Sequence, residues 1–241
     1  MRGAIATLLC LSALACAGVV QAATPPQIAA QQELVALTHT HTVRATPDGA
    51  IEATVAITRP LTQEQTVLPV LSAVIDNSVD TQGQTWLQVR LPGRVLGHKT
   101  PPATGWINAS NTVISTTGWH LVVDLAARRL LVYDNGIHVR SYKAIVGKRS
   151  TPTPTGEYFV EENVKLPPGA PGAPFALATS DRSNALHQFE GGPGQIAIHG
   201  IENLTGTLGT AESHGCIRLA TSAISWLAAR ISPGVPITIS D

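Results

Sequence analysis

Short runs of β-type hydrophobic residues, with weak alternation of hydrophobic and polar positions at residues 50–57, recur along the chain and are separated by clusters of Gly, Pro, Asn and Asp. A period of two residues is typical of β-strands with one buried and one exposed face. The pattern predicts strands at residues 50–57, 66–71, 85–91, 105–107, 121–125, 130–133, 137–142, 158–160 and 195–199. We therefore expect a mainly β protein.

Two local signals add detail to the C-terminal half. The tripeptide Asp134-Asn135-Gly136 separates two predicted strands, and Asn-Gly at such a position is typical of a tight hairpin turn. A helical period occurs later, where Ile224 and Leu227 share one face of a helix predicted over residues 220–231. From residue 118 onward the sequence thus predicts mostly antiparallel β-structure with one short helix.

Changes in composition indicate how the chain divides. Residues 23–57 begin with a Pro-rich and Gln/Ala-rich stretch, and we expect a flexible tether that leads into a first strand. Residues 58–116 hold short strands at the spacing of a small β-barrel, and residues 117–241 renew the strand pattern as a second domain. Within it, residues 163–195 are predicted to be one long irregular stretch, of the kind that often flanks a functional site.

The first 22 residues have the features of a signal peptide. Arg2 precedes an apolar run over residues 4–20, and Val20-Gln21-Ala22 is a small-residue cleavage pattern. No later segment is apolar enough to span a membrane, so we expect an extracytoplasmic protein that is secreted, periplasmic or associated with the cell wall. An alternative is a lipid anchor at Cys16, within Leu14-Ala15-Cys16.

Composition and charge exclude several classes of protein. The 241 residues are 44% hydrophobic and 13% charged, which argues against a globally disordered chain. Lys plus Arg and Asp plus Glu number 16 each, so no basic field exists to attract a phosphate backbone. We expect no nucleic-acid partner.

The cysteine count changes when the signal peptide is removed. Of three cysteines, Cys10 and Cys16 lie in the predicted signal peptide, and only Cys216 remains. A single cysteine in an exported protein is a buried structural residue, one half of an intermolecular disulfide or a reactive nucleophile. Its neighbours must decide between these alternatives.

Those neighbours favour nucleophilic chemistry. The predicted strand 195–199 ends at His199, and the block Ser213-His214-Gly215-Cys216 follows after a short loop. A thiol needs a base to form thiolate near neutral pH, and His titrates in that range. Gly215 leaves room for an approaching carbonyl group and for backbone N–H donors to a developing oxyanion, which suits acyl transfer.

Metal binding is the rival use of Cys and His together. A zinc site needs three or four ligands, and no second Cys or His-x-x-x-His pair accompanies Cys216. His39 and His41 also lack a metal-ligand spacing. We expect no metal and no cofactor.

Other residues have less specific explanations. We expect Glu161-Glu162 to be a solvated strand end, because adjacent residues of a strand face opposite ways. The remaining histidines are expected to be surface residues or hydrogen-bonded residues of the sheet, namely His98, His120, His138 and His187.

The C-terminal half resembles the L,D-transpeptidase catalytic domain of bacterial cell-wall enzymes. The shared residues are His199-Gly200, the block Ser213-His214-Gly215-Cys216-Ile217-Arg218-Leu219, Gly147 and the turn Thr151-Pro152-Thr153-Pro154-Thr155-Gly156. The resemblance extends over residues 118–239 and implies a β-sandwich in which a short helix follows the catalytic cysteine.

The resemblance also implies a role for each matched residue. Cys216 would be the nucleophile, His199 its base, and the Gly200 carbonyl group would orient the His199 ring. His214 would shape the oxyanion pocket and bind substrate, although the sequence alone does not distinguish the two histidines. The remaining residues expected to bind substrate are Ser213, Gly215 and Arg218, with a surface salt bridge as the alternative for Arg218.

The reaction implied is peptidoglycan cross-linking. A tetrapeptide stem would acylate the cysteine with release of D-Ala, and an amine of a neighbouring stem would form a cross-link between third-position residues. Alternatives on the same site are L,D-carboxypeptidase activity and anchoring of a protein to the wall. A non-catalytic wall-binding protein is a further alternative. The expected partners are peptidoglycan stem peptides, and we expect a monomer.

A second resemblance concerns residues 58–116. The strand Trp86-Leu87-Gln88-Val89 followed by Gly105-Trp106-Ile107 resembles the bacterial Src-homology-type barrels that accompany cell-wall enzymes. Such a barrel implies cell-wall binding. We expect Trp86 and Trp106 to be buried barrel residues, the alternative being a platform for a ligand.

Overall fold

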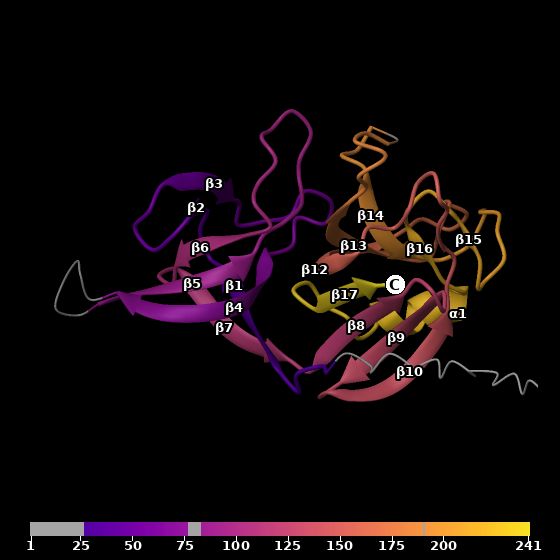
Figure 1. Ribbon diagram of the computed structural model, residues 1–241, viewed down its shortest axis with the longest axis horizontal. Helices are drawn as coiled ribbons and strands as arrows, with labels where there is room; N and C mark the ends of the chain where they lie inside the picture. The colour runs from indigo at the N-terminus through magenta and orange to yellow at the C-terminus, as the bar shows by residue number, and fades with distance from the viewer. Residues whose placement is uncertain (1–26, 77–82, 190) are drawn as a thin grey trace, which may run out of the picture.

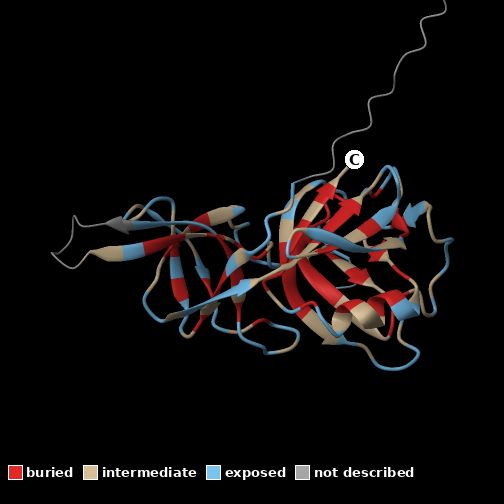
Figure 2. Ribbon diagram, turned by 90° about the horizontal axis from the view of Figure 1, so that it is seen from below, coloured by how far each residue is buried: buried red, intermediate tan, exposed pale blue. Residues whose placement is uncertain are grey.

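The computed structural model describes residues 27–76, 83–189 and 191–241. Two β units lie side by side and give the molecule an elongated shape (Figures 1 and 2). The predicted signal peptide, including Cys10 and Cys16, lies outside the described residues. Among the residues that are described, no helix is both long enough and apolar enough to cross a membrane.

The N-terminal unit is a seven-stranded antiparallel sheet with the order β3-β2-β6-β5-β4-β1-β7. Its strands are β1 (Gln32–Leu37), β2 (His41–Arg44), β3 (Ile51–Val55), β4 (Val67–Asp76), β5 (Gln84–Arg90), β6 (Thr104–Asn108) and β7 (Thr112–Thr117). Of the two predicted barrel tryptophans, Trp86 is buried and Trp106 is half-buried.

The predicted tether is wrong where β1 and β2 form, whereas the strand predicted at its end, over residues 50–57, corresponds to β3. β1 lies between β4 and β7, with Leu34 opposite Pro69 and Ser115. Val35 packs into the core of this unit, whereas the neighbouring Leu34 lies beside Gly234 of the other unit. Because both faces of β1 are covered from Leu34 onward, residues 34–37 are an uninterrupted apolar run, which hides the alternation that identifies an ordinary surface strand.

The C-terminal unit contains an eight-stranded sheet with the order β10-β9-β8-β17-β12-β13-β14-β16, and β11 pairs with β15 beside it. Its strands are β8 (Trp119–Asp124), β9 (Arg129–Asp134), β10 (Ile137–Lys143), β11 (Val146–Gly147), β12 (Gly156–Lys165), β13 (Phe175–Arg182), β14 (Gln195–His199), β15 (Ala211–Ser213), β16 (Ile217–Arg218) and β17 (Pro236–Ser240). The helix is α1 (Thr221–Ala228).

The predictions for this unit are largely confirmed. The structure is mainly β, and β9 and β10 form the predicted hairpin, with positive φ angles at Asn135 (51°) and Gly136 (76°). The helix forms within the predicted range but is shorter. The prediction of one irregular stretch over 163–195 is wrong, because β12 continues to Lys165 and β13 crosses the middle of the stretch.

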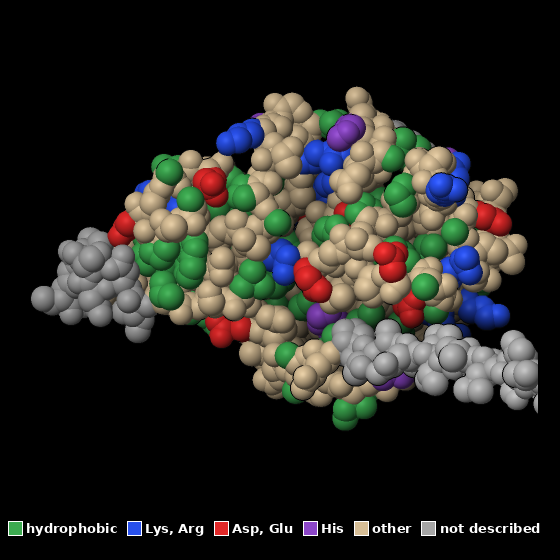
Figure 3. Space-filling model, in the orientation of Figure 1, with side chains coloured by type: hydrophobic (Ala, Val, Ile, Leu, Met, Phe, Trp, Pro, Cys, Tyr) green, Lys and Arg blue, Asp and Glu red, His purple; other side chains and the backbone are tan. Residues whose placement is uncertain are grey.

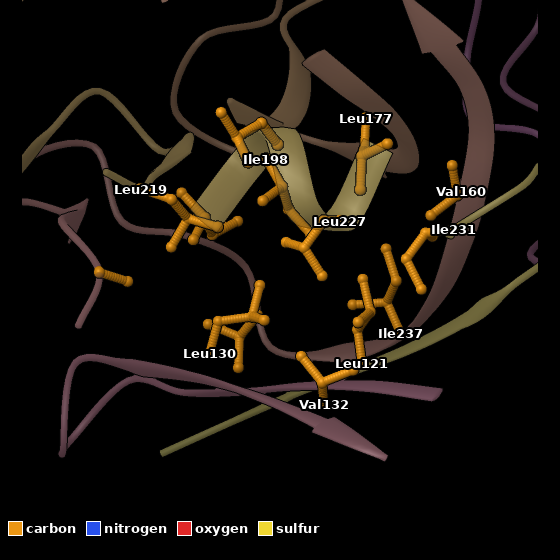
Figure 4. Close-up of a cluster of buried hydrophobic side chains, with 14 of the residues drawn as sticks. Leu121, Leu130, Val132, Val160, Leu177, Ile198, Leu219, Leu227, Ile231 and Ile237 are labelled. Carbon is orange, nitrogen blue, oxygen red and sulfur yellow. The ribbon is translucent and has the colours of Figure 1, made fainter. Parts of the chain in front are cut away.

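One apolar core holds the C-terminal unit together. Figure 4 shows Leu121, Leu130 and Val132 of β8 and β9 on one side, facing side chains of α1, β13 and β14 on the other. Ile224 and Leu227 of the helix are fully buried in this core. The sheet therefore folds around a single core that the helix closes.

The two units also share a core residue. Phe159 of β12 is 1% exposed and packs into the apolar cluster of the N-terminal unit, beside residues such as Leu68 and Val89. A strand of the C-terminal unit thus completes the other unit's core. Since a buried aromatic side chain contributes several kcal/mol to folding, this contact couples the units in stability.

Shortly after Phe159 in sequence, two carboxylates are buried between the units. The prediction that Glu161-Glu162 is a solvated strand end is wrong, because each side chain is 1% exposed. Glu161 accepts hydrogen bonds from Arg59 (2.6 Å) and from Arg182 (3.2 Å), and Glu162 accepts from the N–H of Leu61 (2.8 Å). The register of β12 against β13 shifts between residues 160 and 162, and such a bulge re-aims side chains, so strict alternation fails here.

The outer surface has no face of a single charge sign in the view of Figure 3. Lys and Arg side chains are interspersed with Asp and Glu over both units. This distribution agrees with the equal numbers of acidic and basic residues in the sequence.

We predict that Phe159→Ala destabilises the whole molecule. The free energy of unfolding should fall by about 3–5 kcal/mol, as for other buried Phe→Ala changes, because a cavity opens in the core that the two units share. Phe189→Ala is the matched control, since Phe189 is 44% exposed. Urea unfolding followed by tryptophan fluorescence measures both. Equal stabilities of the two variants would contradict the shared core.

A further buried acid, Asp181, lies near the boundary between the units. Its side chain is 1% exposed, and its Oδ2 has no hydrogen-bond partner among the described residues. Burial raises the pKa of this carboxyl group to about 7, against the smaller opposing effects of the Arg182 backbone, Tyr158 and nearby arginines. Asp181 is therefore largely protonated in the folded protein at mildly acidic pH.

This raised pKa predicts how stability changes with pH. In the unfolded chain, Asp181 binds its proton only below about pH 4. The contribution of this group to the free energy of unfolding is therefore fully present below pH 4 and is lost as pH rises through 7. Asp181→Asn removes the titratable carboxyl group, so the stability of the variant lacks this dependence on pH. The melting temperature of the variant minus that of the wild type should therefore increase by several degrees between pH 4 and pH 8. A difference that does not change with pH would refute the raised pKa.

Candidate active site

The pairing of two strands places Cys216 beside His199. β14 and β16 are parallel neighbours, with Ile198 opposite Ile217 and His199 opposite Arg218. Cys216 directly precedes β16, and its Sγ lies 4.0 Å from the carbonyl oxygen of Gln195 at the start of β14. Two segments that the sequence separates by a loop thus lie side by side.

His199 is oriented by the residue that follows it. Its Nδ1 lies 2.7 Å from the Gly200 carbonyl oxygen, an arrangement in which Nδ1–H donates and Nε2 remains an acceptor. Burial lowers the pKa of His199, the hydrogen bond to Gly200 opposes this shift, and the nearby Arg218 charge adds to it. The ring is consequently neutral at pH 7 and able to accept a proton.

Close backbone packing fixes this histidine. A Cβ atom on Gly172, where φ is +84°, would lie 2.6 Å from His199 Nδ1, and a Cβ on Gly200 would lie 2.1 Å from the Ala173 carbonyl oxygen. The N–H of Gly200 donates to the Gly172 carbonyl group at 2.8 Å. Only glycine permits these approaches, so residues 172–173 act as a rigid support for the ring.

Ser213 and Gly215 shape the turn that carries Cys216. The Ser213 hydroxyl donates to the Cys216 carbonyl oxygen (2.6 Å) and accepts from the Gly215 N–H (3.1 Å), and its residue is fully buried. Gly215 has a φ of +119°, and a Cβ there would lie 2.7 Å from the Ile196 side chain. The structure therefore places these residues, expected to bind substrate, inside the turn and away from the cavity surface.

The threonine-rich turn supports the cysteine turn from behind. Thr153 donates from its hydroxyl to the Gly215 carbonyl oxygen at 2.7 Å and accepts from the Gly147 N–H at 2.9 Å. Thr151 donates to the Ser213 carbonyl oxygen at 3.4 Å. The resemblance gave this turn no role, and the structure shows that its hydroxyl groups hold the turn that carries Cys216.

His214 points away from that support and is exposed. Its Nε2 lies 3.2 Å from Lys148 Nζ, and its ring stacks on Phe189 with 6.0 Å between the ring centroids. The Arg218 side chain donates to the Thr205 carbonyl oxygen at 2.7 Å, so the salt bridge considered from the sequence is replaced by a backbone contact. Lys148 and Phe189 were not identified from the sequence.

A cavity of about 620 Å³ connects these groups. Cys216, His199, His214 and Arg218 all line it, together with apolar side chains such as Leu186 and Phe189. This volume suits an extended peptide segment or a small ligand. The cavity therefore brings together the four sequence-predicted side chains that are able to react with or bind a substrate.

The described residues do not include a cluster of side chains that could bind a metal ion. In the described ranges, no three His, Cys, Asp or Glu side chains are close enough together to hold a metal ion. The expected surface histidines His98, His138 and His187 are exposed, and the His120 ring is hydrogen-bonded to Thr238.

Comparison with protein families identifies the C-terminal unit. Residues 118–239, half of the chain, match the model of the YkuD family, described as the L,D-transpeptidase catalytic domain. The chain belongs to the L,D-transpeptidase family. The predicted family is thereby confirmed, and the unit is a transpeptidase domain whose family acts on peptidoglycan.

Two Bacillus relatives of this L,D-transpeptidase agree with the family match. YkuD of Bacillus subtilis (strain 168) is 30% identical over 125 residues, which cover 52% of this chain and 68% of the relative. YkuD of Bacillus licheniformis is 29% identical over 143 residues, covering 56% and 78%. The solved L,D-transpeptidase from Mycobacterium smegmatis aligns with a TM-score of 0.41 and 19% identity, covering 72% of this chain and 99% of that one.

We predict that His199 controls the ionisation of Cys216. In the wild type, alkylation of Cys216 by iodoacetamide should have its acid limb below pH 6.5, because burial lowers the pKa of His199 and keeps the ring neutral. His199→Ala should move the midpoint toward about pH 8.5, the value of an ordinary thiol. His138→Ala, on an exposed histidine of β10, is the matched control. Coincident profiles of all three proteins would contradict the role of His199.

Proposed function

We propose that this L,D-transpeptidase is an exported enzyme that cross-links peptidoglycan through a cysteine thioester. The observation that carries the proposal is the convergence of Cys216 and His199 on one cavity, with His199 Nδ1 held by the Gly200 carbonyl group. A nucleophile, a base and a group that orients the base are the minimum for acyl transfer.

In the first half-reaction, His199 Nε2 accepts the Cys216 proton. The thiolate attacks the carbonyl carbon at the L-centre of the third residue of a tetrapeptide stem. The C–N bond to the terminal D-Ala breaks, His199 returns its proton to the leaving amine, and a thioester remains on Cys216. The neutral state of His199 at pH 7, which follows from its lowered pKa, favours the initial proton transfer.

In the second half-reaction, an amine of a neighbouring stem attacks the thioester. His199 accepts the proton of that amine, an amide bond forms between third-position residues, and the Cys216 thiolate leaves. Water as acceptor would instead give L,D-carboxypeptidase activity, and an amine of a protein would give anchoring to the wall. All three products share the first half-reaction.

The other side chains on the cavity have supporting roles. His214, which is exposed beside Lys148, contributes to the oxyanion pocket, and Arg218 binds a carboxylate of the stem. Ser213 and Gly215 act through the shape of the cysteine turn. No residue of a second chain is needed for this arrangement, which favours a monomer.

The predicted signal peptide and the N-terminal unit suggest where the enzyme works. Cleavage after Ala22 would release it outside the cytoplasm, with a lipid anchor at Cys16 as the alternative. Residues 58–116 of the N-terminal unit, which resemble a Src-homology-type barrel in sequence, would hold the wall while the C-terminal unit reacts.

We predict that Cys216→Ala abolishes release of D-Ala from a disaccharide-tetrapeptide, because no thioester can form. Acylation by a carbapenem, seen as an added mass on the intact protein, should disappear with it. Mass spectrometry of the wild type after exposure to the tetrapeptide should show a Cys216 adduct that lacks D-Ala. The melting temperature of the variant checks that the fold is retained, and continued D-Ala release by a folded Cys216→Ala protein would overturn the assignment.

A further inference from the structure

One wall of the catalytic cavity comes from the N-terminal unit. We propose that Leu61, in the loop formed by residues 58–65 of that unit, is a specificity-determining residue that contacts the aliphatic part of the donor stem peptide, and that Glu162 positions this loop. The inference rests on the proposed function, which supplies the identity of the substrate. It adds a substrate contact outside the matched catalytic domain.

The exposure of Leu61 is the first observation. Leu61 lines the same cavity as Cys216 and His199, yet 58% of its surface is exposed. Phe189, on another part of the cavity wall, is 44% exposed, and Leu186 also lines the cavity. Large apolar side chains that remain exposed around a reactive thiol are suited to a ligand that covers them.

The loop that carries Leu61 is held in one conformation by its own hydrogen bonds. Thr58 and Gln65 form an antiparallel bridge at its base. Within the loop, the Arg59 N–H donates to the Glu64 carbonyl oxygen (2.9 Å), and the Gln63 N–H donates to the Arg59 carbonyl oxygen (3.1 Å). The backbone at Leu61 is therefore already ordered before a ligand binds. Little conformational entropy of the loop backbone remains to be lost on binding.

The catalytic domain holds this loop in place through Glu162 of β12. Glu162 Oε2 accepts three hydrogen bonds, from the N–H of Leu61 (2.8 Å), the N–H of Thr62 (2.8 Å) and the Thr62 hydroxyl (3.2 Å). Its Oε1 is buried without a hydrogen-bond partner among the described residues. All hydrogen bonds that the Glu162 side chain accepts from the described residues therefore come from the loop. The preceding Glu161 binds Arg59 at the start of the same loop.

The chemistry of the cavity lining indicates how a stem peptide lies. Arg218 and His214 supply polar groups, and Leu61, Leu186 and Phe189 supply apolar surface, with the Phe189 ring stacked on His214. A stem peptide is amphipathic in the same sense, because it carries carboxylates together with alanyl methyl groups and an aliphatic side chain. We place the aliphatic groups against Leu61 and a carboxylate toward Arg218.

The first test compares Leu61→Ala with Leu71→Ala. Leu71 is the matched control, since it is 42% exposed on the same unit and does not line the catalytic cavity. For D-Ala release from a disaccharide-tetrapeptide, Leu61→Ala should raise KM about ten-fold, as expected for loss of one buried leucine contact, with kcat changed by less than about two-fold. Leu71→Ala should match the wild type. Alkylation of Cys216 by iodoacetamide should be equal in all three.

The second test separates positioning by Glu162 from a general structural role. Glu162→Ala should raise KM as Leu61→Ala does, whereas Glu162→Gln, whose amide oxygen can still accept the loop N–H groups, should restore most of the wild-type value. The double variant Glu162→Ala/Leu61→Ala should have the KM of Leu61→Ala alone, because Glu162 acts through Leu61. Independent, multiplicative effects on KM would contradict the positioning role.

These outcomes distinguish the inference from the proposed function. An active wild type with an unchanged KM in Leu61→Ala overturns the inference alone. A wild type that releases no D-Ala, and whose Cys216 the tetrapeptide does not protect from iodoacetamide, overturns the proposed function and the inference with it. Protection of Cys216 that is weakened about ten-fold in Leu61→Ala supports the substrate contact independently of turnover.

Discussion

The burial of one carboxylate, Glu161, constrains the arrangement of the whole molecule. A charge with 1% exposure costs several kcal/mol unless it is paired and fully hydrogen-bonded. Its partners are Arg59 and the Gly93 N–H from the N-terminal unit, and Arg182 and Gln195 from the C-terminal unit. Neither unit alone can satisfy this group, so the two must dock in one orientation.

The same constraint reaches Cys216 through one strand. The Gln195 side chain donates to Glu161 at 3.3 Å, and the Gln195 carbonyl oxygen lies 4.0 Å from Cys216 Sγ. β14 runs from Gln195 to His199, so a single strand joins the buried carboxylate to His199. Its partner strand β16 begins directly after Cys216, so backbone pairing sets where Cys216 lies relative to His199.

The two neighbouring carboxylates of β12 bind different groups at the boundary between the units. Glu161 pairs with guanidinium groups, while Glu162 accepts hydrogen bonds from the backbone of the Leu61 loop. Both reach across because a bulge interrupts the alternation of β12. The catalytic domain matches its family over residues 118–239. One wall of its cavity nevertheless comes from Leu61, which lies outside these residues.

Local sequence patterns predicted five strands of the C-terminal unit (β8, β9, β10, β12 and β14), its hairpin at Asn135-Gly136 and its helix, because periodicity and turn chemistry act over a few residues. They did not predict β1, whose two covered faces remove the alternation, nor β13 within a stretch rich in Gly and Pro. The missed strands depend on which surfaces meet, and that information is distributed over distant parts of the chain.

The sequence by itself determined which residues are available for the proposed chemistry. One cysteine in the block Ser213-His214-Gly215-Cys216, with His199-Gly200 upstream, specifies the residue types for acyl transfer and identifies the family. Only the tertiary structure decided that Glu161 and Glu162 are buried and that Leu61 lines the cavity. The reason is physical: reactivity depends on which side chains are present, whereas burial and cavity shape depend on long-range packing between the two units.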